Sequence, residues 1–352
     1  MPKKIGAWLL LLSLILECLL LGACQKKPNT EKYSSYSFDY FDTVTSITGY
    51  TESQEEFDRI SDAILSELER YHKLFNIYYP YEGMNNLYTI NQVIDGAHAT
   101  VRVEKEIMDM LLYAKEMYTL TGGQVNVAMG SVLSIWHEYR ESGLRDPQNA
   151  KIPPAEDLIA AAAHTDIENV ILDTVENTVF LSDPAMRLDV GAIAKGYAVE
   201  QVALRLESLG ISGFVLNVGG NVRTVGARGD GERWTVGIEN PLDTEGDYVA
   251  LLSLADLSLV TSGSYQRFYT VGDLRLHHII DPDTLMPATG FASVSIVTKS
   301  SALADALSTA LFSMSYADGL ALIESIPEAE AMWCFENGEI LYSSGFEAYR
   351  KQ

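Results

Sequence analysis

Short strand-like segments dominate the second half of the chain, and this pattern constrains the fold more than any other feature of the sequence. Helical spacing of apolar residues interrupts the series only at 196–209 and 302–313. A hairpin over 332–342, turned at Asn337-Gly338, closes it. Strands that are joined by short turns pair antiparallel, so the sequence predicts an α+β fold with mostly antiparallel sheets. The expected strands cover 170–173, 178–181, 213–218, 234–238, 249–254 and 258–261.

The first half of the chain supplies most of the expected helices. A strand within 38–51 opens the domain, and 78–91 and 140–154 are expected to be loops. No internal repeat or second linker interrupts the chain, so we expect one globular domain over residues 37–350. The expected helices cover 54–75, 105–121, 126–136 and 155–164.

The N-terminus predicts secretion and a lipid anchor. Two lysines precede an apolar run over 5–21, and small residues then lead to Cys24, as in a bacterial lipoprotein signal. We expect residues 1–23 to be a signal peptide, Cys24 to be lipidated, and the polar residues 24–36 to be a flexible tether at the membrane surface. The alternative is an uncleaved anchor, which the charged Glu17 disfavours. The expected location is extracytoplasmic and membrane-anchored.

The charge balance excludes one class of partner. The chain holds 25 Lys and Arg against 48 Asp and Glu, a net charge of -23. Nucleic-acid binding depends on basic patches that contact phosphates, so no nucleic-acid partner is expected. Beyond the signal, only Cys24 and Cys334 remain, so no intramolecular disulfide is expected once Cys24 carries lipid.

The segment Asp189-Val-Gly-Ala-Ile-Ala-Lys-Gly196 predicts a phosphate-binding site. It places a carboxylate and an ammonium six residues apart in a small, apolar stretch between an expected strand and an expected helix. Backbone N–H groups at such a junction can bind phosphate oxygens, and Lys195 adds a full positive charge. The alternative is a tight turn in which Asp189 caps the following helix.

Three further motifs follow expected strands. Asn217-Val-Gly-Gly-Asn221 would let a bulky ligand approach the backbone, or it is a plain hairpin turn. Thr261-Ser-Gly-Ser-Tyr265 offers hydroxyls beside Arg267. His277-His-Ile-Ile-Asp-Pro282 contains imidazoles, the usual proton carriers near neutral pH.

Asp305-Ala-Leu-Ser-Thr309 lies where a helix is expected to begin. Asp305 and Thr309 are one helical turn apart, so both oxygens could meet one cation, and hard oxygen ligands suit magnesium or calcium. The alternative is a carboxylate favoured by the helix dipole with a buried threonine. Taken with the motifs above, the pair predicts metal-assisted phosphoryl or nucleotidyl chemistry.

In these motifs the chain resembles the ApbE-type FAD:protein FMN transferases. The resemblance implies a T-fold-like α+β domain that binds FAD with Mg²⁺ and moves FMN onto a Ser or Thr hydroxyl of a target flavoprotein, releasing AMP. The same oxygens would also accept Ca²⁺ or Mn²⁺. The motifs that carry the resemblance are Phe41-Asp-Thr43, Asp189 to Gly196, Asn217 to Asn221, Thr261 to Tyr265, His278 to Pro282 and Asp305 to Thr309.

The resemblance also implies roles for individual residues. Asp305, Thr309 and the Ala192 carbonyl would hold the metal, and His278 would be the base for the acceptor hydroxyl, with Asp281 sharing that work. Asn126 stands where many members have a carboxylate, which implies an altered grip on adenine or ribose. The implied FAD contacts are Asp189, Lys195, Gly123, Asn126, Asn217, Gly219, Gly220, Ser262, Gly263 and Ile279.

Two other functions use the same site. If water replaced the acceptor hydroxyl, the chain would be an FAD pyrophosphatase that yields FMN and AMP. A non-catalytic, surface FAD-binding lipoprotein would need neither a base at His278 nor the Asp305 and Thr309 pair. No Asp-x-x-Ser/Thr-Gly-Ala-Thr acceptor motif occurs in the chain, so the resemblance implies that it modifies another protein.

Overall fold

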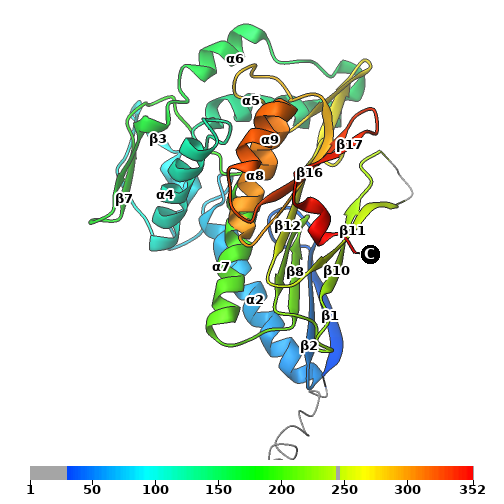
Figure 1. The fold of residues 1–352 in the computed structure, drawn as a ribbon. Helices are drawn as coiled ribbons and strands as arrows, with labels where there is room; N and C mark the ends of the chain where they lie inside the picture. The colour runs from blue at the N-terminus through cyan, green and yellow to red at the C-terminus, as the bar shows by residue number, and fades with distance from the viewer. Residues whose placement is uncertain (1–29, 243–245, 352) are drawn as a thin grey trace, which may run out of the picture.

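The computed structural model describes residues 30–242 and 246–351. Within them, eight strands form one sheet in which every neighbouring pair is antiparallel (Figure 1). In order across the sheet, the strands are β1 (Glu31–Ser37), β2 (Thr45–Thr51), β8 (Phe214–Val218), β9 (Asn221–Val225), β12 (Ser258–Gly263), β15 (Phe291–Thr298), β16 (Glu330–Phe335) and β17 (Ile340–Tyr342).

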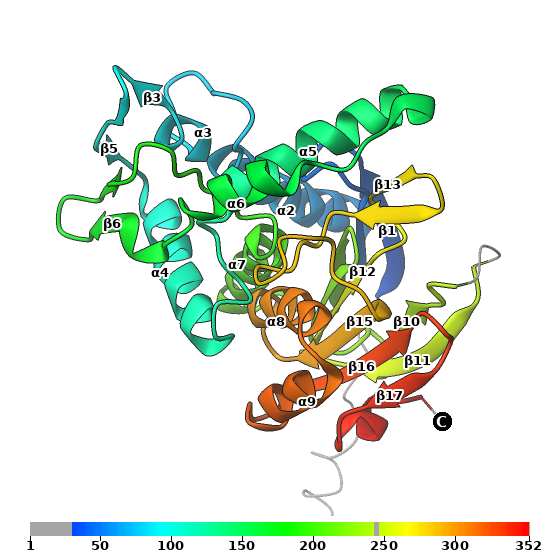
Figure 2. The same ribbon diagram turned by 90° about the horizontal axis from the view of Figure 1, so that it is seen from above.

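The two faces of this sheet are covered differently. Figure 2 shows α8 and α9 on one side of β15 and β16, with the β10–β11 hairpin on the other. The helices on the first side are α2 (Gln54–Leu74), α7 (Ala194–Ser208), α8 (Ser301–Ser313) and α9 (Tyr316–Glu324), and the hairpin strands are β10 (Trp234–Glu239) and β11 (Tyr248–Leu254).

Side-chain alternation along the central strands explains this sandwich. On β15, Val294 and Ile296 join the core beneath the helices, whereas Val297 joins a separate core beneath the hairpin. On β12, Val260 and Leu259 divide in the same way. Successive strand residues point to opposite faces, so a strand covered on both sides is buried along its whole length, as β15 is.

A third apolar core lies at one end of the sheet. It joins α5 (Gly130–Arg145) and α6 (Ala155–Ala162) to the hairpin of β13 (Phe268–Val271) and β14 (Leu274–His277). The remaining elements are α3 (Leu87–Ile90), α4 (Lys105–Leu120), β3 (Val93–Ile94), β4 (Ala97–His98), β5 (Val101–Arg102), β6 (Val170–Asp173), β7 (Thr178–Leu181), and the single 3-10 turns η1 (Pro147–Asn149), η2 (Ile167–Asn169) and η3 (Phe346–Tyr349).

The mixture of helices and antiparallel sheets confirms the predicted fold class, but the expected tether was wrong over its second half. Glu31–Ser37 forms β1, which pairs with all of β2. Tyr33 packs on Phe57 of α2, with ring centroids 5.7 Å apart. β1 is an edge strand with mostly exposed or half-buried side chains, and a polar edge strand has the composition of a linker.

Other expectations concern residues outside the described part of the chain, or a helix whose bounds differ from those expected. The predictions for residues 1–23, for Cys24 and for residues 24–29 of the tether fall outside the described part of the chain. No helix in residues 30–242 and 246–351 is both long and apolar enough to cross a membrane. The helix expected over 126–136 instead runs as α5 from Gly130 to Arg145, through the start of the expected 140–154 loop.

Candidate active site

A pocket of about 420 Å³ opens where the main sheet meets the third core. It is bounded by the turn between β8 and β9, the end of β12, the segment after β14, and the facing ends of α7 and α8. Each motif identified in the sequence contributes at least one residue to the pocket wall. The motif residues that line it are Asp42, Thr43, Asp189, Gly191, Ala192, Lys195, Gly219, Asn221, Thr261, Ser262, Gly263, His277, His278, Ile279, Ile280, Asp305 and Thr309.

Asp305 is the most deeply buried charged group on this wall, with 3% of its surface exposed. Its Oδ2 accepts a 2.7 Å hydrogen bond from the backbone N–H of Gly196. Burial raises the pKa of Asp305, and the nearby charge of Lys195 opposes that shift. α8 begins at Ser301, one turn earlier, so Asp305 does not occupy the helix N-terminus and that alternative is wrong.

The contact between α7 and α8 depends on the absence of a side chain at Gly196. A Cβ there would lie 2.3 Å from Cβ of Asp305 and 2.4 Å from the carbonyl oxygen of Ser301. Atoms cannot approach so closely, so only glycine lets the two helices meet here. The glycine that ends the Asp189–Gly196 motif therefore places the carboxylate of the next motif.

The oxygen groups beside Asp305 fit a hard divalent cation. Thr309, one turn along α8, and Ala192, in the turn before α7, line the same pocket. A carboxylate, a hydroxyl and a backbone carbonyl are the ligand types that Mg²⁺ accepts, with water or substrate oxygens completing its shell. No cluster of three or more His, Cys, Asp or Glu side chains that could hold a metal occurs in the described residues.

Lys195 and Asn221 offer donors for an anionic ligand. Lys195 lies half-buried in the wall and forms no ion pair with any described residue. Asn221 is 1% exposed, and its Nδ2 has no hydrogen-bond partner within residues 30–242 and 246–351, although it lies near enough to Asp305 to lower the pKa of that carboxyl. A buried donor without a partner is costly, so a ligand oxygen at this position would be stabilising.

The glycine pair between β8 and β9 makes the turn that presents Asn221. Gly219 and Gly220 have φ values of 55° and 90°, which L-residues rarely adopt, and Asn217 accepts a 3.0 Å hydrogen bond from the Gly220 N–H. Asn217 and Gly220 are not in the pocket wall, whereas Gly219 and Asn221 are. The motif is therefore both a hairpin turn and part of the site.

The Phe41-Asp-Thr43 motif is held against this turn in a strained conformation. Phe41 and Asp42 have φ values of 56° and 50°, and Arg267 donates a 3.1 Å hydrogen bond to the Asp42 carbonyl. A Cβ on Gly219 would lie 2.3 Å from Oγ1 of Thr43. Strain of this kind persists where the surroundings enforce it, and here it brings Asp42 and Thr43 into the pocket wall.

His278 has the geometry and protonation state of a general base. Its Nδ1 lies 3.3 Å from the Arg267 carbonyl, which can only accept, so Nδ1 carries the proton and Nε2 keeps its lone pair. The residue keeps exposed surface, but protein atoms crowd around its ring. This desolvation, followed by the charges of Arg267 and Lys195, lowers the pKa of His278 from 6.5 to about 3, so it is neutral at pH 7.

His277 and Asp281 have structural roles instead. Nε2 of His277 donates to the Ala288 carbonyl at 2.7 Å and its Nδ1 accepts from the Ile279 N–H at 3.2 Å, so neither nitrogen is left for catalysis. The Asp281 carboxylate accepts from Thr284 Oγ1 at 2.9 Å and from the N–H of residue 283 at 2.8 Å. It caps its own turn and is not in the pocket wall, so its share in the work of the base stays a prediction.

Comparison with known proteins agrees with this assembly of motifs. The profile of the ApbE family matches residues 41–333. The chain belongs to the ApbE family. The FAD:protein FMN transferase of Klebsiella pneumoniae (strain 342) is 31% identical over 281 residues, which are 77% of this chain and 84% of the relative. That of Treponema pallidum (strain Nichols) is 32% identical over 261 residues, 70% of each chain.

Solved ApbE structures share the fold. The crystal structure of the ApbE protein from Thermotoga maritima matches with a TM-score of 0.79 and 27% identity, and covers 92% of this chain and 100% of that one. The flavin transferase ApbE from Vibrio cholerae matches with a TM-score of 0.75 and 25% identity, over 91% and 99% of the two chains.

Of the remaining FAD contacts implied for this ApbE chain, two line the pocket and one does not. Asp189 lines the pocket, and its Oδ1 accepts from the Gly191 N–H at 2.8 Å. α7 begins only at Ala194, so Asp189 is not its N-cap and that alternative is wrong. Asn126 also lines the pocket. Its Nδ2 donates a 2.9 Å hydrogen bond to the carbonyl of residue 165, which links two segments distant in the sequence. Gly123 is not in the wall, but its neighbour residue 124 is.

Sequence reasoning missed an aromatic and basic side of the ApbE pocket. Tyr78 and His137 lie with ring centroids 5.2 Å apart, and Trp136 and Arg140 of α5 also line the pocket. A smaller pocket of about 250 Å³ continues beyond them and shares Tyr78, His137 and Asp189 with the first. The unexpected length of α5 is the reason: His137 and Arg140 were not recognised as residues of one helix facing the site.

Proposed function

We propose that this ApbE chain transfers FMN from FAD to a Ser or Thr hydroxyl of another protein and releases AMP. The observation that carries the proposal is the meeting, in one pocket, of a neutral His278, the buried Asp305 and Lys195, which forms no ion pair with any described residue. A base, an anion-binding ammonium and a cation-binding carboxylate are what attack on a pyrophosphate requires. Relatives in the same family carry the name FAD:protein FMN transferase.

The proposed step exchanges the phosphoanhydride bond of FAD for a phosphoester bond to the acceptor. Nε2 of His278 takes the proton of the acceptor hydroxyl, and the oxygen attacks the phosphorus on the FMN side of the pyrophosphate. The new O–P bond forms as the bond from that phosphorus to the bridging oxygen breaks, and AMP leaves with the bridging oxygen. Lys195 and the Asn221 amide bind pyrophosphate oxygens, and Arg267 holds His278 in the required tautomer through its carbonyl.

Asp305, Thr309 and the Ala192 carbonyl are proposed to hold Mg²⁺. When bound, the ion neutralises pyrophosphate charge and stabilises the departing AMP. Gly196 orients Asp305 by the hydrogen bond to its Oδ2, and the second carboxylate oxygen is then available to a cation. The basic groups of the opposite wall, Arg140 and Arg267, contribute to anion binding in a chain whose net charge is -23.

The deciding experiment incubates the purified full-length chain with FAD, Mg²⁺ and an acceptor domain that carries an Asp-x-x-Thr-Gly-Ala-Thr motif. Intact mass spectrometry of the acceptor should show a gain of one FMN, and nucleotide analysis should show an equal amount of AMP. His278→Asn and Asp305→Asn should each abolish the gain. AMP without a mass gain would mean hydrolysis, and bound but unchanged FAD would mean a carrier.

We also propose that the chain is an extracytoplasmic lipoprotein anchored through Cys24. The support is the lipobox-like end of the apolar N-terminal run. Mass spectrometry of the N-terminal peptide from membranes should find lipid on Cys24 and no residues of 1–23. Finding Cys24 without lipid, or an N-terminal peptide that retains residues 1–23, would contradict this proposal.

A further inference from the structure

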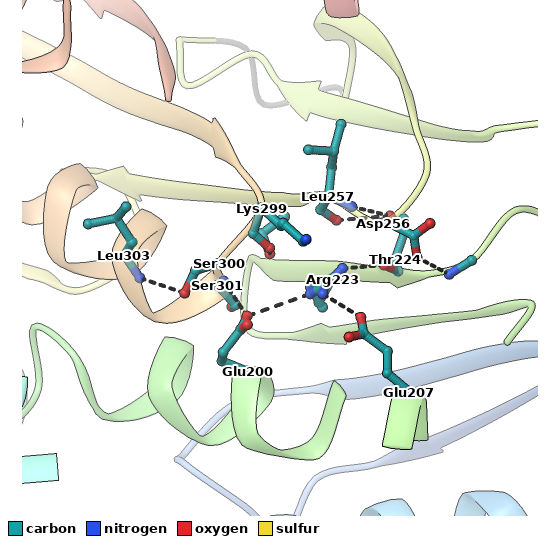
Figure 3. Close-up of polar contacts among 12 residues, drawn as sticks. Glu200, Glu207, Arg223, Thr224, Asp256, Leu257, Lys299, Ser300, Ser301 and Leu303 are labelled. Atoms are coloured by element: carbon teal, nitrogen blue, oxygen red, sulfur yellow. Dashed lines mark hydrogen bonds and ion pairs between the residues drawn. The ribbon is translucent and has the colours of Figure 1, made fainter. Parts of the chain in front are cut away.

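A charged cluster centred on a buried arginine joins α7 to β9 (Figure 3). Arg223 of β9 is 0% exposed and donates from Nη2 to Oε1 of Glu207 at 2.7 Å. Its Nε lies 3.6 Å from Oε2 of Glu200, which is 8% exposed. None of the three lines the pocket. Arg223 and Glu200 are both buried, whereas Glu207 reaches solvent. Buried ion pairs contribute little net stability over apolar packing, so the contact between Arg223 and Glu200 calls for another explanation.

Glu200 connects the cluster to α8. Its Oε2 accepts a 2.7 Å hydrogen bond from the backbone N–H of Ser301, the first residue of α8 (Figure 3). The first N–H groups of a helix lack partners within the helix, and its N-terminus favours negative charge. Ser300 supplies the usual cap by accepting from the Leu303 N–H at 3.3 Å. A carboxylate from a neighbouring helix therefore completes the start of α8.

Two hydrogen bonds of the same length hold α8 against α7. Gly196 and Glu200 are one turn apart on α7, and they bind Asp305 and Ser301, which are one turn apart on α8. Both donor–acceptor distances are 2.7 Å. Two contacts separated by a helical turn restrict both the sliding and the rotation of one helix on the other, which a single contact would not.

We infer that Glu200, held in place by Arg223, is a positioning residue for the active site. It sets α8 against α7 so that Asp305 and Thr309 face Ala192 and Lys195 across the pocket. The inference rests on the cation role given to Asp305 in the proposed function. Residues that orient a metal ligand without touching the metal commonly change metal affinity when they are replaced.

The test measures FAD binding by the full-length chain as a function of Mg²⁺ concentration, from the quenching of flavin fluorescence. Glu200→Ala should raise the Mg²⁺ concentration needed for half-maximal binding about tenfold. Glu200→Gln should shift it less, because an amide oxygen can still accept from Ser301. Glu106→Gln is the matched control, since Glu106 pairs with Arg70 away from the pocket. It should leave the Mg²⁺ requirement unchanged.

A second arm asks whether Glu200 acts through Asp305. If it does, adding Glu200→Ala to an Asp305→Ala background should produce no further change in the Mg²⁺ requirement, because coupled residues are not additive. An unchanged Mg²⁺ requirement in Glu200→Ala, with only a lower melting temperature, would overturn the inference and leave the proposed function intact. Wild-type FAD binding that ignores Mg²⁺ would overturn the cation role of Asp305 and the inference with it.

Discussion

The backbone N–H of Gly196 donates a 2.7 Å hydrogen bond to Oδ2 of Asp305, a residue 109 positions later in the chain. Two motifs that are far apart in the sequence are thereby parts of one structure. Because no Cβ fits between the helices at this point, the distance from α7 to α8 and the position of the carboxylate are set together. Substitutions that only change the spacing of α7 and α8, and that remove no functional group, should therefore alter the geometry of the site.

Gly196→Ala should be more damaging than an ordinary glycine substitution in a helix. The added methyl group must push Asp305 or the Ser301 carbonyl aside, so we expect a loss of about 1–3 kcal/mol in the free energy of unfolding together with a large loss of FMN transfer. Chemical denaturation and the acceptor mass assay would measure both effects. Gly319→Ala on α9 is the control, because its nearest neighbour would be an ordinary 3.4 Å away; it should be neutral or slightly stabilising.

Asn221→Leu should separate ligand binding from folding. The variant removes a buried Nδ2 that has no partner in the described residues, so the melting temperature should change little or rise. FAD affinity should fall about tenfold if that amide donates to a pyrophosphate oxygen. Fluorescence titration and thermal unfolding give the two values. Unaltered FAD affinity would show that the amide does not contact the ligand.

The pH dependence of transfer should lack a step near pH 6.5. The pKa of His278 is lowered to about 3, so the base stays unprotonated as the pH falls from 8 to 5, and kcat/KM should lose no activity to this group over that range. A plot of kcat/KM against pH is the measurement. An acid limb centred at pH 6 to 7 that disappears in His278→Asn would contradict the lowered pKa.

The same shift has a consequence for stability. In the unfolded chain this histidine has its ordinary pKa of 6.5, so between pH 6.5 and about 3 the unfolded state binds a proton that the folded state does not. Folding stability from this residue is therefore full above pH 6.5 and is lost as the pH falls below it. Burial lowers the pKa of His277 as well, which adds in the same direction.

Truncations should locate the true start of the domain. Removing residues 1–30 should leave the melting temperature unchanged, because β1 begins at Glu31. Removing residues 1–37 should lower it and expose the edge of β2, since the strand pairing and the packing of Tyr33 on Phe57 are lost. Equal melting temperatures for the two truncations would mean that β1 contributes nothing to the fold.

Much of the site was predictable because its residues occur in short motifs at the ends of secondary-structure elements. Small residues mark where the backbone must bend or approach closely, as at Gly219 and Gly196. Antiparallel pairing was also visible, because strands such as β6 and β7, which pair in a smaller sheet, are separated by a short turn. Local signals of this kind can be recognised in the sequence without knowledge of the three-dimensional structure.

What the sequence did not reveal depends on long-range packing. Asp281 sits in the motif with His278, but its carboxylate is used by the turn that it begins. Tyr78 meets His137 on a helix that continues beyond its expected end at residue 136, and the outer part of that helix has too few buried residues to give a helical pattern. Glu200 is four residues beyond the motif glycine, and nothing local shows that its partner is Ser301.

β1 also determines where the site lies relative to the proposed anchor. The chain enters the sheet at Glu31 and reaches the pocket wall at Asp42, after running the length of the strand. Seven residues of strand span about 23 Å. With Cys24 lipidated as proposed, the second half of the expected tether belongs to the sheet, so only residues 24–30 would separate the lipid from the folded domain. A target hydroxyl would then have to come within the reach that this short segment allows.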